Sequence, residues 1–217
     1  MQNALTLAFD TSAAHCAAAL LSGNTVMAQR VETMVKVQAE RLFGVLDELM
    51  SGVGVTWKDL GRIGVGVGPG NFTGIRISVA AARGLALSLE VPAIGVSTFA
   101  ALAHELPRPV VACVDARGGR MYVQHLGQTE AKKPLIADAD VIPAHLFAKG
   151  PCVVGHHARE LAARHGGEFR APKFPVAVAI AKIAAASDAR QAPRPVPLYV
   201  RAPDAAPPRQ RAPVILP

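Results

Sequence analysis

The sequence has few aromatic residues, few charged residues and few cysteines, and each shortage excludes a class of protein. Aromatic residues make up only 5% of the chain, and no stripe interleaves them with lysine or arginine, so no strong sign of nucleic-acid binding is present. Charged residues are 18% and hydrophobic residues 51%, which excludes a disordered body and allows a real core. The three cysteines, Cys16, Cys113 and Cys152, form no CxxC pair. We therefore expect buried, reduced thiols and no structural zinc.

Long apolar runs, a leader and the common hydrolase motifs are also missing. No run approaches the roughly 18–20 apolar residues that a membrane span needs. The opening MQNALTLAFD has no basic segment, and Asp10 interrupts its apolar residues, so it does not resemble a signal peptide. The seven histidines form no HExxH or HxxxH pair, and no GxSxG is present. We expect a cytosolic protein with no membrane segment, no metal and no hydrolase site.

Positive charge is concentrated toward the C-terminal end. The net charge is +7, and residues 190–217 contribute five arginines and one aspartate, hence +4, which leaves +3 for residues 1–189. From residue 192 the chain carries eight prolines, which predicts an extended or disordered tail. A basic tail is compatible with nucleic acid nearby, and a solvated tail is the simpler interpretation.

The first half of the sequence alternates strands and helices around a glycine-rich loop. Residues 61–90 combine a short buried strand, the loop 68–74 and a long apolar helix. This order presents free backbone N–H groups to an anion. Gly23-Asn24 is a two-residue hairpin signal. The expected strands are residues 4–9, 16–22, 25–31, 62–67 and 93–97, and the expected helices are residues 38–50, 75–89 and 98–105.

The second half repeats the order strand, aspartate, turn, strand, with Asp115 in the place of Asp10. This duplication predicts an α/β protein with the actin-like, sugar-kinase-like ATPase (ASKHA) fold, in which two lobes each combine a mixed sheet with helices and the second lobe is reduced. The expected lobes are residues 1–106 and 107–190, followed by a tail at 191–217. Within the second lobe we expect strands at 110–114, 120–126, 134–142 and 151–155, a short helix from Pro143, and helices at 156–165 and 176–186.

Two loops of the first half are candidates for holding phosphate. Hydroxyls and turn N–H groups can hold phosphate, and an aspartate at a strand end can position a metal-bound water. The alternative is that the same residues only make turn and capping hydrogen bonds. The sequence leaves both interpretations open, because the second loop is neither a Walker A loop nor GxGxxG. We expect Thr73 to cap the following helix and the turn at Asp115 to be a structural hairpin. The candidate residues are Asp10, Thr11, Ser12, Gly68, Gly70, Asn71, Thr73 and Gly74.

Two helices of the first half carry more apolar surface than one sheet can cover. On residues 38–50 an apolar stripe recurs at i, i+3, i+4, i+7 and i+8, and Phe43 falls outside it. Residues 75–89 are apolar almost all round, with Arg76 and Arg83 seven residues apart on one side. The surplus predicts a partner protein, and an internal core helix is the alternative.

Five segments of the chain resemble one bacterial family. They are LAFDTSAAHCAAALL, GVGVGPGNFTGIRISVAAARGLAL, PAIGVSTFAALA, VDARGGRMYV and PLYVR. In order and spacing these segments are similar to the TsaB (YeaZ) family, from residue 5 to about residue 201. The resemblance implies an ASKHA fold and a role in making threonylcarbamoyladenosine in tRNA. It also implies a non-catalytic partner of the catalytic subunit TsaD, without the histidine pair that holds metal there. Gln38 stands where many family members have a histidine.

The resemblance further implies how such a chain assembles. Family members pair with TsaD through the two helices of the first lobe, or with a second copy when TsaD is absent. The ATPase TsaE joins the pair, the enzyme TsaC supplies threonylcarbamoyl-adenylate, and tRNA is met only indirectly. The phosphate-type loops are then vestigial, with no cofactor beyond a weak or interface-shared nucleotide. The implied contact residues are Leu42, Phe43, Leu46, Leu49, Met50, Ile75, Arg76, Val79, Ala82, Arg83, Leu85 and Ala86.

The resemblance makes a scaffold that activates TsaD the leading hypothesis for function. The alternative is a small ASKHA-type phosphotransferase or ATPase that uses Asp10 and the loop 68–74. A protease is a third hypothesis, for which the sequence offers no catalytic residues.

Overall fold

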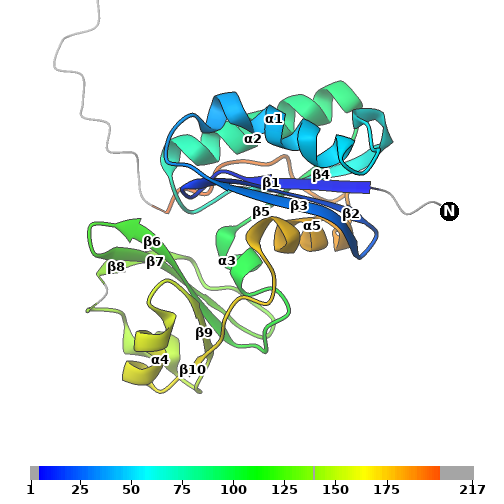
Figure 1. Ribbon diagram of the computed structural model, residues 1–217. Coiled ribbons are helices and arrows are strands. Elements are labelled where there is room, and N and C mark those ends of the chain that lie inside the picture. Colours follow the sequence, from blue (N-terminus) through cyan, green and yellow to red (C-terminus); the bar gives the residue numbers. More distant parts are fainter. Residues whose placement is uncertain (1–4, 139, 201–217) are drawn as a thin grey trace, which may run out of the picture.

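The computed structural model describes residues 5–138 and 140–200. Two five-stranded mixed sheets form the molecule, with the strand orders β3-β2-β1-β4-β5 and β10-β9-β6-β7-β8. Figure 1 shows the two sheets as separate layers, each with its own helices. The first sheet contains β1 (Leu5–Asp10), β2 (His15–Ser22), β3 (Thr25–Thr33), β4 (Leu60–Gly66) and β5 (Ala93–Val96).

The central strand β1 is buried on both faces. It pairs antiparallel with β2 and parallel with β4. Because side chains alternate along a strand, Leu7 and Phe9 enter one core cluster and Ala8 enters another. Helices α1 (Gln38–Ser51) and α2 (Phe72–Leu89) cover the first of these faces, as Figure 1 shows.

The opposite face of the first sheet is covered by α5 (Val176–Ala186). Because residues 176–186 follow the second lobe in the chain, we predicted that this helix belongs to that lobe. This prediction is wrong. The face it covers is lined by Ala8, Ala17 and Ala19, so an alanine-rich helix can approach closely. A Cβ on Gly64 would lie 2.9 Å from the Cβ of Ala184. The lobe boundaries otherwise stay a prediction.

The C-terminal end of α5 is tied to the first sheet by one arginine. Arg62 Nη1 donates to the carbonyls of Ala184, Ala185 and Ser187 at 2.7, 3.0 and 3.0 Å. The last carbonyls of a helix lack helical N–H partners, although that of Ala184 also accepts from the Ser187 N–H, and a cation is favourable at a helix C-terminus. The arginine therefore fixes where α5 ends on the sheet.

The second sheet is built around the hairpin of β6 (Val110–Arg117) and β7 (Arg120–Leu126). It is completed by β8 (Leu135–Asp138), β9 (Cys152–Gly155) and β10 (Glu168–Phe169), with α4 (Ala158–His165) on one face. The short helix α3 (Thr98–Leu102) links the sheets. Single 3₁₀ turns occupy Trp57–Asp59 and Ala144–Phe147.

Several element ends differ from the sequence prediction. The second apolar helix begins at Phe72, and its N-cap is Asn71, whose Oδ1 accepts from the Gly74 N–H at 3.1 Å. The predicted cap, Thr73, lies inside the helix because an asparagine side chain two residues earlier already satisfies the free N–H group. The helix predicted at 98–105 ends at Leu102, and the strand predicted at 134–142 is limited to Leu135–Asp138.

Helix α2 passes the length and composition test for a membrane span. It has 18 residues and a mean hydropathy of 1.2. The sequence prediction that no run approaches this length is therefore wrong by this measure. The helix packs Ile75, Val79 and Ala82 into the first core cluster. Such packing is typical of a core helix, and core helices can also be long and apolar enough to cross a membrane.

A chain of surface charges joins α1 to the edge strand β3. Arg41 donates to Glu32 at 2.6 and 2.7 Å and to Glu48 at 2.7 and 2.9 Å. These hydrogen bonds lower the pKa of both glutamates below the ordinary range. Since the side chains are solvated, salt screens the network, and it orients α1 more than it stabilises it.

The three cysteines are buried and unpaired, as predicted. Burial raises the pKa of the Cys113 thiol to about 12 and is the main cause that raises that of Cys16 to about 11. Neither thiol is a nucleophile at neutral pH, because the thiolate is the reactive form.

The segment after α5 is extended, as predicted, and part of it is packed. The Leu198 N–H donates to the Val67 carbonyl at 2.8 Å, and Leu198 packs against the first core cluster and against a further cluster that includes Phe99, Val110 and Val154. The remainder of the predicted tail, residues 201–217, lies outside the described residues.

Candidate functional site

The first candidate loop begins with Asp10, at the end of β1. Its Oδ2 accepts from the Ser12 N–H at 3.2 Å and from the Ser12 hydroxyl at 2.9 Å, and lies 2.9 Å from His15 Nε2. Asp10 is 1% exposed, and its Oδ1 is buried without a partner. A Cβ on Gly66 would lie 1.9 Å from that oxygen. Oδ2 is therefore bonded within its own turn, and Oδ1 has no protein partner.

Gln38, the first residue of α1, holds the turn after β1 through side-chain hydrogen bonds. Its Nε2 donates to the carbonyls of Thr11, Ala13 and His15 at 3.3, 2.7 and 2.7 Å. Gln38 is 6% exposed. We did not predict this role from the sequence, although the spacing could have indicated it, because Gln38 lies four residues before Leu42 and so on the buried stripe.

The two candidate loops close against each other. The Asn71 N–H donates to the Ser12 carbonyl at 2.6 Å, and the Thr11 hydroxyl donates to the Gly74 carbonyl at 2.6 Å. A Cβ on Gly74 would lie 1.9 Å from the Thr11 carbonyl oxygen. The N–H groups of Asn71 and Gly74 are thus satisfied by protein atoms. These groups make turn and capping hydrogen bonds, and phosphate binding by the two loops stays a prediction.

The glycines of the second loop serve close approach. A Cβ on Gly70 would lie 2.3 Å from the Ser12 carbonyl oxygen, and one on Gly68 would lie 2.5 Å from Ile75 Cδ1. Gly68 also has a φ of 91°, which side chains rarely adopt. Thr73 is exposed and lines the cavity between the lobes. The structure therefore brings the predicted loop residues together at one place.

A cavity of about 1020 Å³ lies between the two sheets at these loops. The second lobe contributes Asp115, Arg117 and His156 to its wall. Asp115 Oδ1 accepts from the Arg117 N–H at 2.7 Å, so the predicted structural hairpin is confirmed. Within residues 5–138 and 140–200, no group of three His, Cys, Asp or Glu side chains is arranged to hold a metal ion.

The C-terminal segment forms part of the wall of the same cavity. The ring of Tyr199 lies 5.0 Å from that of Phe72, and the Arg76 Nε donates to the Tyr199 hydroxyl at 3.0 Å. The Arg76 guanidinium lies 3.8 Å above the Phe72 ring, a cation–π distance. Arg76 therefore contacts side chains of its own chain at the start of α2.

Most residues of the predicted partner surface are core residues. Seven of the twelve are 5% exposed or less, because their side chains face the first sheet. A partner cannot reach them, and this part of the prediction is wrong. They are Leu42, Leu46, Leu49, Met50, Ile75, Val79 and Ala82.

The outward face of the same helices still carries apolar groups. Phe43 on α1 is 45% exposed, and Leu87 on α2 is 76% exposed. Leu85 and Ala86 are half-buried. Exposed apolar residues on neighbouring helices are typical of a protein contact surface. We call Phe43, Leu85, Ala86 and Leu87 the outer helix face.

Known proteins resemble this chain in sequence and in fold. Residues 32–176 match the sequence model of "TsaD: tRNA N6-adenosine threonylcarbamoyltransferase". The chain is 36% identical over 121 residues to the tRNA threonylcarbamoyladenosine biosynthesis protein TsaB of Escherichia coli, a match that covers 54% of this chain and 52% of that protein. The chain belongs to the TsaB (YeaZ) family. It spans about half the length of the curated TsaB relatives it matches.

Other comparisons extend over nearly the whole chain. An uncharacterized protein of Mycobacterium tuberculosis is 30% identical over 212 residues, covering 95% of this chain and 96% of that protein. The solved structure of YeaZ from Pseudomonas aeruginosa is 26% identical, with a TM-score of 0.68, and covers 90% of this chain and 99% of that one. Two further solved structures, 10% and 12% identical, match at TM-scores of 0.54 and 0.55, which shows the fold alone. The predicted actin-like, sugar-kinase-like fold is confirmed.

Proposed function

We propose that this TsaB-family chain is a non-catalytic subunit that pairs with TsaD, and through it with TsaE, for threonylcarbamoyl transfer to tRNA. One observation carries the proposal: several buried hydrogen-bonding groups of the two phosphate-type loops are bonded to protein atoms, within a loop or between the loops. Asp10 is bound to Ser12 and His15, and the Asn71 N–H is bound to the Ser12 carbonyl. A phosphoryl-transfer site needs such groups free to face the phosphate and its metal.

The same observation weighs against the alternative of a small phosphotransferase. A metal at Asp10 Oδ2 would displace three contacts of a buried carboxylate, which is costly, and Oδ1, which has no partner, is buried beside Gly66. The family membership supports a role in threonylcarbamoyladenosine synthesis, with tRNA met indirectly. A cytoplasmic location and a homodimer in the absence of TsaD belong to the same proposal.

Reconstitution tests the function. TsaD and TsaE from the same organism, with ATP, threonylcarbamoyl-adenylate and tRNA, are combined with and without this chain, and modified adenosine is measured. We expect modification to depend strictly on the chain and to be absent when it is incubated without TsaD. Full activity in its absence would contradict the proposal and return the phosphotransferase to first place.

The outer helix face is the proposed contact with TsaD. Leu87→Glu should weaken assembly at least about tenfold, because it places a charge in an apolar contact. Val141→Glu is the matched control, since Val141 is 74% exposed on the second lobe, against 76% for Leu87. Both variants should unfold at the temperature of the unmodified chain. Equal affinities for TsaD in titration calorimetry would remove the outer helix face from the proposal.

A further inference from the structure

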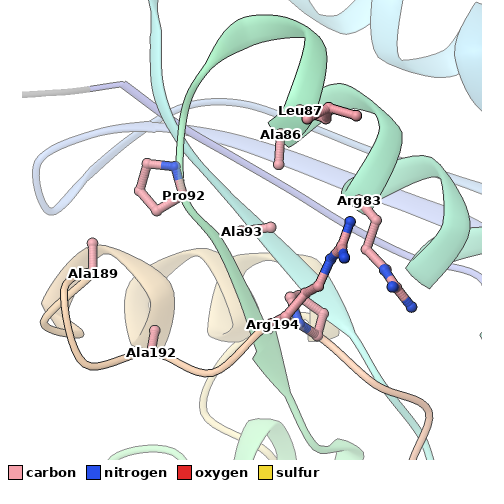
Figure 2. A pocket seen from close by; sticks show the side chains of 9 residues that line it. Arg83, Ala86, Leu87, Pro92, Ala93, Ala189, Ala192 and Arg194 are labelled. Carbon is pink, nitrogen blue, oxygen red and sulfur yellow. The ribbon is translucent and has the colours of Figure 1, made fainter.

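A pocket of about 340 Å³ lies beside the second half of α2. Figure 2 shows its wall, formed by α2, by β5 with the residue before it, and by the segment that follows α5. Two of the nine residues that line it are arginines, and the other seven are apolar. Those seven are Ala86, Leu87, Pro92, Ala93, Ala189, Ala192 and Pro195. We call this the arginine groove.

The two arginines reach the arginine groove from different parts of the chain. Arg83 comes from α2 and Arg194 from the segment after α5, and Figure 2 shows both side chains at the same edge of the pocket. Within residues 5–138 and 140–200, no hydrogen bond or ion pair involves either guanidinium. By contrast, Arg62 caps α5 and Arg41 binds two glutamates. No other charged residue of the described chain lines this pocket.

Nothing in the fold explains why two positive charges share this groove. Arg83 lies before the last turn of α2, which contains no basic residue, so the helix dipole stabilises it little. Arg83 is half-buried, and two like charges in one pocket repel each other. An anion placed between two guanidinium groups would relieve that repulsion and form charge-assisted hydrogen bonds.

We propose that the arginine groove binds an Asp or Glu side chain of the partner subunit, together with an adjacent apolar residue. This inference rests on the proposed function, because Leu87 and Ala86 belong both to the groove and to the outer helix face. The groove therefore extends that contact surface toward β5. Its apolar floor favours a protein segment over RNA, since nucleic-acid interfaces are more polar and more strongly basic.

Charge reversal in the TsaD complex tests the inference. Arg83→Glu and Arg194→Glu should each weaken assembly at least about tenfold, because a like charge then faces the partner's carboxylate. Arg190→Glu is the matched control, since Arg190 is exposed on the same segment and does not line the pocket. Affinity for TsaD is measured from about 0.05 M to about 0.5 M salt, and the unmodified chain should lose more affinity with salt than either variant. An acidic-to-lysine substitution in TsaD should restore binding to Arg83→Glu.

The outcomes separate this inference from the proposed function. If Leu87→Glu prevents assembly while both arginine variants bind like the unmodified chain, the groove inference fails and the partner proposal stands. If none of the three changes assembly, the groove inference fails and the outer helix face is removed from the proposal; the proposed function itself fails only if modification does not depend on the chain. If the arginine variants assemble normally but the complex loses affinity for tRNA, the groove binds RNA phosphate, and the inference is overturned.

Discussion

Replacing Gln38 with glutamate should cost about 3–5 kcal/mol of folding free energy at neutral pH, the range expected for an uncompensated buried charge. The amide nitrogen of Gln38 donates to three carbonyls. A carboxylate has no donor and would face those oxygens with a negative charge. Denaturant unfolding followed by circular dichroism measures the loss.

The loss should also depend on pH, and its sign follows from the site. The three carbonyls favour the protonated form of the new carboxyl group, so its pKa is raised in the folded state above the unfolded value. Stability is then nearest to that of the unmodified chain below the ordinary glutamate pKa. It falls as pH rises from there to the raised value. A loss that stays constant over this range would contradict the role assigned to the amide.

Two variants serve as controls for Gln38→Glu. Gln38→Met keeps the length of the side chain and adds no charge, so it should cost less, about 1–3 kcal/mol for the unsatisfied carbonyls. Glu40→Gln makes the reverse exchange, of a carboxylate for an amide, at an exposed position of α1. It should change stability by less than about 0.5 kcal/mol. Equal losses for Gln38→Glu and Gln38→Met would show that charge is not the cause.

Replacing Gly74 with alanine should cost about 3 kcal/mol, because the new methyl group would meet backbone that cannot move alone. Its Cβ would lie 1.9 Å from the Thr11 carbonyl oxygen. Moving that carbonyl would disturb its hydrogen bond from Gln38 and the neighbouring bond from Asn71 to Ser12. The free energy of unfolding in urea measures the cost.

The same substitution farther along α2 should have the opposite sign. A Cβ on Gly84 meets no atom within 4 Å, and the residue is exposed. Gly84→Ala should therefore stabilise the chain by about 0.5–1 kcal/mol, the helix preference for alanine over glycine. If both variants lost similar stability, the closure of the two loops would not explain the glycine at position 74.

The sequence predicted the order of elements well where hydrophobic periodicity decides the structure. Strands β1, β2 and β4 and helices α1, α2 and α5 were found within a few residues of their ends. Placement in space was harder. Helix α5 follows the second lobe in the chain but packs on the first sheet, and only the alternating small residues of β1 and β2 indicate this.

The sequence predicted which residues belong to the candidate site, but not which hydrogen bonds they form. The eight loop residues do come together, yet the sequence could not show that their donors and acceptors satisfy one another. That depends on the register of β1 against β4 and on the depth at which Gln38 sits. For the partner surface, the stripe of α1 indicated burial correctly, but the sequence did not separate burial in the chain's own core from burial against another protein. Phe43, outside that stripe, was the useful signal.

The position of α5 has a consequence for synthesis of the protein on the ribosome. Strand β1 leaves the exit tunnel first, but the helix that covers its alanine face is made only at residues 176–186. One face of the first sheet therefore stays exposed to water and to chaperones until the second sheet and α5 have been translated. Contacts between such distant parts of a chain form slowly. A fragment ending at residue 106 would keep that face uncovered, and aggregation is the expected fate of such a fragment.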